Sequence, residues 1–201
     1  MNKTSFSVLA LAVGLLSLAG CASGPTYVDA KGQNLIVEVD KINIQDFDSA
    51  ANEMVASLIE KIVANDKLKS SSPTEPALMA ISRIKNSTGS QLETDLLIKK
   101  IRVQLLGTGK VQATTTMNLG GAEDPLAKEN QAAEEFRDDK KHTRLPDYTL
   151  SGNIIEDRSK AGKVRQSAFV FQLSLSSRAG IAIWEDERTI AKQGKRPSVG
   201  Y

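Results

Sequence analysis

The sequence of 201 residues contains a single cysteine and a single histidine. A metal site made of cysteine and histidine needs three or four such ligands, and a disulfide within the chain needs two thiols, so both are excluded. Aromatic residues make up only 4% of the chain, and Lys and Arg number 26 against 24 for Asp and Glu. Because the charges are interspersed, the composition gives no sign of a nucleic-acid partner.

The amino terminus carries an apolar run, residues 6–19, which is too short to cross a bilayer comfortably as a helix. The run follows the cation Lys3 and ends in Leu18-Ala19-Gly20-Cys21. A spanning helix needs about 20 apolar residues, so the pattern is typical of a secretory signal peptide. Its last four residues form a lipobox, in which the cysteine at the cleavage point receives a diacylglyceryl group. The sequence therefore predicts a signal peptide over residues 1–20 and lipidation at Cys21.

The residues that follow predict a flexible tether over 21–34, because they are small and turn-rich and show no apolar period. Ala22 follows the cysteine, and the absence of aspartate there favours sorting to the outer membrane. We therefore expect the chain at the periplasmic face of the outer membrane, held by its lipid anchor. The dozen or so residues from Cys21 to Asn34 span at most about 45 Å when fully extended, at about 3.5 Å each.

The first part of the body alternates between strand and helix periods. Residues 33–44 alternate at period two, with an irregularity near Asp40, and predict a strand. Residues 48–64 place apolar side chains three and four positions apart, which predicts an amphipathic helix capped by Asp46 or Asp48.

The middle of the chain predicts a strand, a turn, a helix and a second strand. An apolar run at 77–84 suits a buried strand, and a dense turn follows at 86–89. An amphipathic helix is predicted over 92–106, and a threonine-rich strand over 111–117. The charged stretch 123–141 has few apolar positions and predicts an exposed helix.

The last quarter predicts a three-stranded antiparallel meander. Its strands are joined by hairpin-length connections at 159–163 and 177–180, and the third strand is expected to end near Ile190. The clearest period-two face comprises Phe169, Phe171, Leu173 and Leu175. A meander buries one face, and the two amphipathic helices can cover it. We therefore expect one layered α+β domain over residues 35–190, with a mostly antiparallel sheet, and a tail over 191–201.

Three groups of residues could suggest chemistry, but a structural role suits each better. Glu185 and Glu187 share one face of a strand and Asp186 the other, as at a solvated strand end. The turn at 86–89 precedes a helix, but it has one glycine and no Lys-Ser/Thr pair, so anion binding is the lesser alternative there. His142 has no patterned acid or nucleophile for general-base chemistry. No catalytic residue, metal or cofactor is expected.

Several runs in the body together resemble the LpoB family. They are Ile81-Ser-Arg-Ile-Lys-Asn-Ser-Thr-Gly-Ser90, Leu105-Leu-Gly-Thr-Gly-Lys-Val111, Asp147-Tyr-Thr-Leu-Ser-Gly-Asn-Ile154, Val170-Phe-Gln-Leu-Ser-Leu175 and Gly180-Ile-Ala-Ile-Trp184. The resemblance covers residues 45–190 and implies a TolB amino-terminal-like fold. It also implies a noncatalytic outer-membrane lipoprotein, without a small-molecule substrate, that docks on the regulatory domain of a class A penicillin-binding protein and activates it.

The chain departs from the family pattern in two places. Its tether is short and carries one proline, Pro25, where well-known members have a long proline-rich segment, and Lys192–Pro197 extend past the last predicted strand. If the regulatory domain lies beyond the reach of this tether and one small domain, the partner must be nearer the outer membrane. The alternative is therefore a structural or assembly lipoprotein of the same fold, serving flagellar or curli-type outer-membrane machinery.

A protein without catalytic residues acts through its surface, and binding energy concentrates in Trp, Tyr and Arg anchors. The candidate partner-binding residues are Arg178, Trp184, Lys192, Lys195 and Arg196. Arg178, on the second hairpin, ranks first. Trp184 could equally pack in the core, and the three basic residues of the tail could equally form a solvated charge run.

Overall fold

The computed structural model describes residues 27–29, 32, 35–114 and 144–195. The predicted signal peptide, the lipobox, Arg196 and the helix expected at 123–141 lie outside these residues. The chain divides into a unit that ends at Leu35 and a body that begins at Ile36. In the first unit, the Gly32 amide donates to the carbonyl of Asp29 at 2.9 Å. No helix within the described ranges is long and apolar enough to cross a membrane.

The body is a single α+β domain with one mixed sheet of six strands in the order β3-β1-β4-β5-β6, and β2 pairs with β4. The strands are β1 (Ala77–Ile81), β2 (Lys85–Ser87), β3 (Val111–Ala113), β4 (Tyr148–Ala161), β5 (Val164–Ser177) and β6 (Ala182–Lys195). Antiparallel pairing joins the three long strands along their whole length, as the predicted meander requires. The shorter strands pair in parallel, over three residues at each contact.

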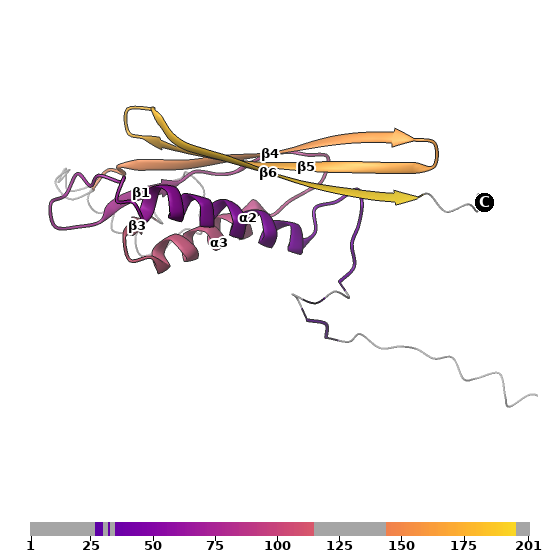
Figure 1. The fold of residues 1–201 in the computed structure, drawn as a ribbon, viewed down its shortest axis with the longest axis horizontal. Coiled ribbons are helices and arrows are strands. Elements are labelled where there is room, and N and C mark those ends of the chain that lie inside the picture. The colour runs from indigo at the N-terminus through magenta and orange to yellow at the C-terminus, as the bar shows by residue number, and fades with distance from the viewer. Residues whose placement is uncertain (1–26, 30–31, 33–34, 115–143, 196–201) are drawn as a thin grey trace, which may run out of the picture. The chain divides into compact units, whose positions relative to one another are not determined.

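Two helices cover one face of the sheet, so the domain has two layers (Figure 1). They are α2 (Ile44–Leu58), which continues into a π-helical turn at Ile59–Val63, and α3 (Thr94–Gly107). The chain leaves α3 through Gly109, whose φ of 67° is the left-handed conformation that favours glycine. This helix agrees with the sequence prediction of a helix over 92–106.

The core lies between α2 and the helix-facing side of β5. Phe169, Phe171, Leu173 and Leu175 are all buried there, as their period-two pattern predicts. The Phe47 ring of α2 meets the Phe171 ring edge to face, with centroids 5.9 Å apart. The side chains between them on β5 are only partly buried, which is the alternation of a sheet covered on one face.

The strand predicted over 33–44 is wrong: residues 35–43 form no strand, and α2 begins at Ile44. Asp46 stands inside the first turn, where its carboxylate accepts the backbone N–H of Asn43 at 2.7 Å and so fixes the start of the helix. The carbonyls of this segment accept hydrogen bonds from side chains, such as the Ser90 hydroxyl on Asp40 at 3.4 Å. The alternating apolar residues therefore form no strand here, because their backbone carbonyls bind side chains and not the backbone of another strand.

Strand β6 runs to Lys195, five residues past the predicted end at Ile190. The reason lies in the β4–β5 hairpin, whose turn is only Gly162 and Lys163, so that β5 offers partners as far as Val164, which pairs with Lys195. Gly194 lets the segment before α2 cross β6 closely, since a Cβ on Gly194 would lie 2.7 Å from Val39 Cγ2. Strand pairing thus continues where the sequence predicts a charged tail.

Side chains from β6 itself occupy part of its outer edge, which no other described strand pairs with. Asp186 Oδ1 accepts the backbone N–H of Glu187 at 2.9 Å, and Arg188 Nη1 donates to the Glu187 carbonyl at 2.8 Å. Arg188 also pairs with Glu53 of α2 at 3.1 Å. Charged side chains on the covered face of an edge strand discourage pairing with another chain.

Candidate functional site

The candidate partner-binding residues do not form one site. Arg178 lies in the hairpin before β6, whereas Lys192 and Lys195 lie at the opposite end of that strand. β6 has 14 residues, and at about 3.3 Å per residue it spans about 45 Å. The structure therefore separates the arginine from the basic residues of the predicted tail.

Trp184 belongs to the core. Its side chain is buried with 7% of the residue exposed, and it pairs with Leu175 of β5 on the face that the helices cover. Of the two roles that the sequence allows, core packing is the one that the structure shows. Little of the indole is therefore open to a partner in this structure.

Lys192 is not a solvated charge, because only 9% of its side chain is exposed. Its Nζ donates to Asn43 Oδ1 and Asp46 Oδ2, each at 2.6 Å, and to the Lys41 carbonyl. The ammonium also lies 5.1 Å from the centre of the Phe169 ring. Lys192 therefore ties β6 to the start of α2, and of the two described tail lysines only Lys195 is exposed.

Arg178 is exposed but firmly held. About half of its side chain, 52%, is open to solvent. Its Nε donates to the Pro146 carbonyl at 3.0 Å, and its Nη2 donates to the Leu145 carbonyl at 2.7 Å. The hairpin turns through Gly180, with φ of 78°, and the Arg178 amide donates to the Asp147 carbonyl at 3.0 Å. The guanidinium is thus positioned by the segment that leads into β4.

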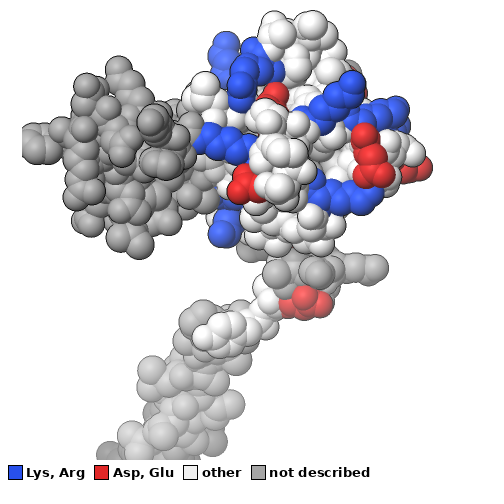
Figure 2. Space-filling view, turned by 90° about the vertical axis from the view of Figure 1, so that its left-hand side faces the viewer, with Lys and Arg blue, Asp and Glu red and all other residues white. Residues whose placement is uncertain are grey.

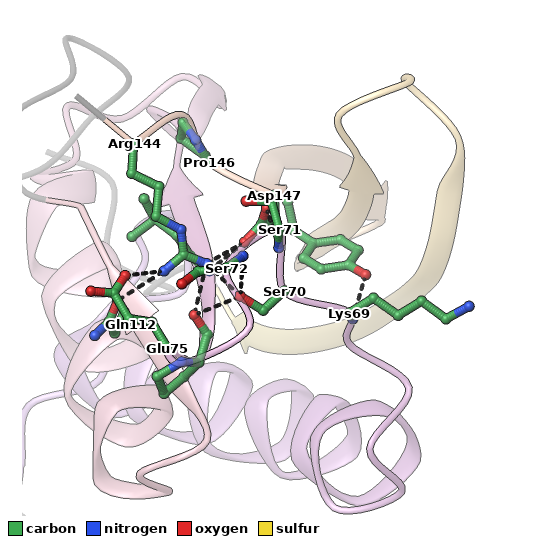
Figure 3. A network of polar contacts seen from close by, with 12 residues as sticks. Lys69, Ser70, Ser71, Ser72, Glu75, Gln112, Arg144, Pro146 and Asp147 are labelled. Atoms are coloured by element: carbon green, nitrogen blue, oxygen red, sulfur yellow. Dashed lines mark hydrogen bonds and ion pairs between the residues drawn. The ribbon is translucent and has the colours of Figure 1, made fainter. Parts of the chain in front are cut away.

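That segment is anchored by the buried carboxylate of Asp147, whose side chain is 6% exposed (Figure 3). It accepts the backbone N–H of Leu78 at 2.9 Å and of Ser71 at 3.2 Å, and it pairs with Arg144 Nη2 at 2.7 Å. Burial alone would raise the pKa of Asp147, but these hydrogen bonds from Ser71, Leu78 and Arg144 outweigh it and hold the pKa below its usual range.

Arg144 extends the same network to the loop before β1. Its guanidinium donates to the Pro76 carbonyl at 2.9 Å and to the Ser70 hydroxyl at 2.8 Å, and it pairs with Glu75 at 2.8 Å. In Figure 3 these groups surround the arginine, while the Lys69 side chain extends away from them. The loop at 67–76, the segment at 144–147 and the hairpin at 177–181 therefore form one connected surface, which we call the Arg178 end.

The Arg178 end contains a shallow pocket with basic and apolar side chains around it. The lining residues are Lys69, Ser70, Ser71, Asp147, Tyr148, Ser177, Arg178 and Ala179. Two large apolar residues of the surface are exposed, Leu145 at 54% and Ile181 at 64%. Figure 2 views this end of the molecule and shows more Lys and Arg than Asp and Glu on it.

Sequence reasoning misses most of this surface. Leu145, Arg144 and the loop at 67–76 lie outside any helix or strand, so no periodicity marks them. The only local signals are the Leu145-Pro146 pair and the serines of the loop, both typical of ordinary connections.

Of the other groups that could suggest chemistry, His142 lies outside the described residues, and the remaining two have structural partners. The Gly89 amide of the turn at 86–89 donates to Glu156 Oε2 at 2.9 Å, so a carboxylate of the chain itself occupies the position that an anion would take. Glu185 accepts the Ser174 hydroxyl at 2.8 Å, and Glu187 accepts the Gln172 amide at 2.7 Å. In the described part of the chain, no three His, Cys, Asp or Glu residues are grouped to hold a metal ion.

Comparisons with known proteins point to one family. The family model described as peptidoglycan-synthase activator LpoB matches residues 46–190. A search of curated proteins finds no match. Among solved structures, the LpoB C-terminal domain from Escherichia coli shares 14% identity, with 72% of this chain and 98% of that chain covered and a TM-score of 0.43.

Two further structures are distantly similar. The LpoB C-terminal domain from Salmonella enterica shares 16% identity, with 72% of this chain and 98% of that chain covered and a TM-score of 0.41. The lipoprotein GNA1162 from Neisseria meningitidis shares 14% identity, with 61% and 88% covered and a TM-score of 0.34. At such low TM-scores the structural likenesses carry no argument, and the family model alone supports the assignment.

Proposed function

Because this chain belongs to the LpoB family of peptidoglycan-synthase activators, we propose that it binds and activates a class A penicillin-binding protein. The observation that carries the proposal is the family match, which covers both helices and the sheet almost completely. The chain would act by contact with the regulatory domain of the synthase and without chemistry of its own. The predicted lipid on Cys21 would hold it at the periplasmic face of the outer membrane.

The layout of the body supports this role despite the short tether. The chain enters the body beside the carboxyl end of β6, where Lys192 binds Lys41 and Asn43. The Arg178 end lies at the other end of the same strand, about 45 Å away at about 3.3 Å per residue. A partner that docks there can be about twice as far from the outer membrane as the tether alone allows.

The rate of peptidoglycan synthesis tests the proposal. The full lipoprotein is added in detergent to a class A penicillin-binding protein from the same organism, and glycan polymerisation and peptide cross-linking are both measured. We expect both rates to rise, and the lipoprotein to co-purify with the synthase from cross-linked cells. If neither rate changes and the cross-linked partner is a flagellar or curli-type assembly protein, the alternative function is correct.

Lipidation gives a separate prediction. Cys21→Ala should leave an unprocessed or soluble periplasmic form, because the lipobox offers no other acyl acceptor, and several acyl chains anchor a protein far more firmly than one. Mass spectrometry of the mature amino terminus and membrane fractionation measure this. As the matched control, Ala22→Asp should keep the lipid and move the protein to the inner membrane in enterobacterial-type sorting. An unmodified Cys21 in the native protein would contradict the proposed localisation.

A further inference from the structure

We propose that the Arg178 end docks a protein surface on which a carboxylate is framed by apolar side chains. This inference rests on the proposed function and names the docking surface and the chemistry of the partner. Three observations carry it: the Arg178 guanidinium is held in place before binding, two exposed apolar residues belong to the same surface, and the nearby charges leave an excess of positive charge.

The first observation is the fixed position of Arg178. Nε and Nη2 of its guanidinium donate to the carbonyls of Pro146 and Leu145, while half of the side chain remains open to solvent. An arginine fixed in this way loses less conformational freedom when it binds, which favours affinity. Its planar fork can also receive a carboxylate in a directed geometry that a lysine cannot match.

The second observation is the apolar frame. Leu145 contributes one of the two carbonyls that hold Arg178, and its own side chain is 54% exposed. Ile181 closes the same hairpin, since its carbonyl accepts the Ser177 amide at 2.8 Å, and it is 64% exposed. Hot spots of interfaces are enriched in arginine, and the residues around such an anchor exclude water from it, a role that exposed apolar residues of the same surface can fill.

The third observation is the charge balance of the pocket. Its lining contains two cations, Lys69 and Arg178, and one anion, Asp147. Asp147 is already paired with Arg144 at 2.7 Å, and it lies 3.7 Å from Arg178. Lys69 is exposed and forms no ion pair with another described residue. The pocket therefore favours an acidic group, and opposite charges also speed the encounter of two proteins.

A protein partner suits these features better than a small anion does. A free phosphate or carboxylate would use the two cations, but it would leave Leu145 and Ile181 in water. A protein surface can cover both apolar side chains and place one acidic side chain at Arg178. The regulatory domain of the synthase, under the proposed function, should therefore present an aspartate or glutamate beside apolar residues.

Binding of substituted full-length lipoproteins to the synthase tests this surface. Arg178→Ala should weaken the Kd by about 30-fold or more, the range of a hot-spot arginine. Arg178→Lys should recover only part of the affinity, because it keeps the charge and loses the fork. Ile181→Ser should also weaken binding. The matched control is Lys163→Ala, which removes an exposed cation from the turn between β4 and β5, at the other end of β5, and should leave the Kd unchanged.

Two further measurements separate the possible outcomes. The melting temperature of each variant is measured in parallel, so that a loss of binding with an unchanged fold is assigned to contact. Replacing the acidic residue of the synthase with lysine or arginine should restore binding to the Arg178→Glu variant. If Arg178 had only a structural role, this exchange of charges would not restore binding. If the wild-type lipoprotein activates the synthase and Arg178→Ala binds as well as Lys163→Ala, the proposed docking surface is wrong and the proposed function stands. If the wild-type protein neither binds nor activates, the proposed function itself fails.

Discussion

Replacing Phe171 with alanine is expected to lower the free energy of unfolding by about 3–5 kcal/mol, the usual cost of removing a buried phenylalanine side chain. Phe171 is 1% exposed and lies at the centre of the core, where its ring meets that of Phe47 at a centroid distance of 5.9 Å. The substitution removes this contact and leaves a cavity that rigid neighbours cannot fill. Urea denaturation, monitored by the single tryptophan, measures the change.

A neighbouring residue on the same strand provides the control. Val170 points to the uncovered face of the sheet and is only partly buried, so Val170→Ala should cost less than about 1 kcal/mol. The ratio of the two effects reports which face of β5 is buried. Equal losses, or a larger loss for Val170→Ala, would mean that the register of the meander is inverted.

The meander could be predicted from the sequence because one simple rule governs it. A strand covered on one face alternates apolar and polar residues, and Phe169 to Leu175 follow that rule except at Val170, which is apolar and lies on the uncovered face. The same rule fails for residues 33–44, whose alternating apolar residues form no strand, and Ile36 there is 84% exposed. Period two indicates a strand only where another strand is available to pair with it, and a partner far along the chain is invisible to a local pattern.

The prediction of a charged tail at the end of β6 is wrong for the opposite reason. Lys192 has the composition of a solvated tail, yet three oxygens from the start of α2 surround its ammonium. Those oxygens lie about 150 residues earlier in the chain, as the separations of 151, 149 and 146 residues show. A buried lysine is stable only when such partners are present, so burial could not be inferred from the lysine itself.

The candidate site shows both the strength and the limit of sequence reasoning. Arg178 could be ranked first because a short connection between two strands must be a surface hairpin, and the structure places it on one. The residues that hold it could not be found from the sequence. The loop at 67–76 meets Asp147 only because β1 pairs with β4, which places Met79 opposite Tyr148. A docking surface built from three loops depends on sheet topology and not on any motif.

Asp147→Ala is expected to lower the free energy of unfolding by about 2–4 kcal/mol, because it removes a buried carboxylate and leaves its partners unpaired. The backbone amides of Leu78 and Ser71 lose their acceptor, and Glu75 remains as the one acidic partner of Arg144 among the described residues. Asp157→Ala is the matched control, since Asp157 lies on β4, the strand that follows Asp147, is exposed, and should change stability by less than about 0.5 kcal/mol when replaced.

The pH dependence identifies the cause of that loss. Hydrogen bonds hold the pKa of Asp147 in the folded protein below its ordinary value of 3.8. A carboxyl group whose pKa is lower in the folded state stabilises the fold at pH values above its unfolded pKa, and this contribution disappears as the pH falls through the folded pKa. The difference in stability between wild type and Asp147→Ala should therefore be constant from pH 5 to 7, at about 2–4 kcal/mol, and should shrink below the ordinary pKa. A difference that does not change with acid would mean that Asp147 acts through packing alone, and that its charge does not hold the loops of the Arg178 end together.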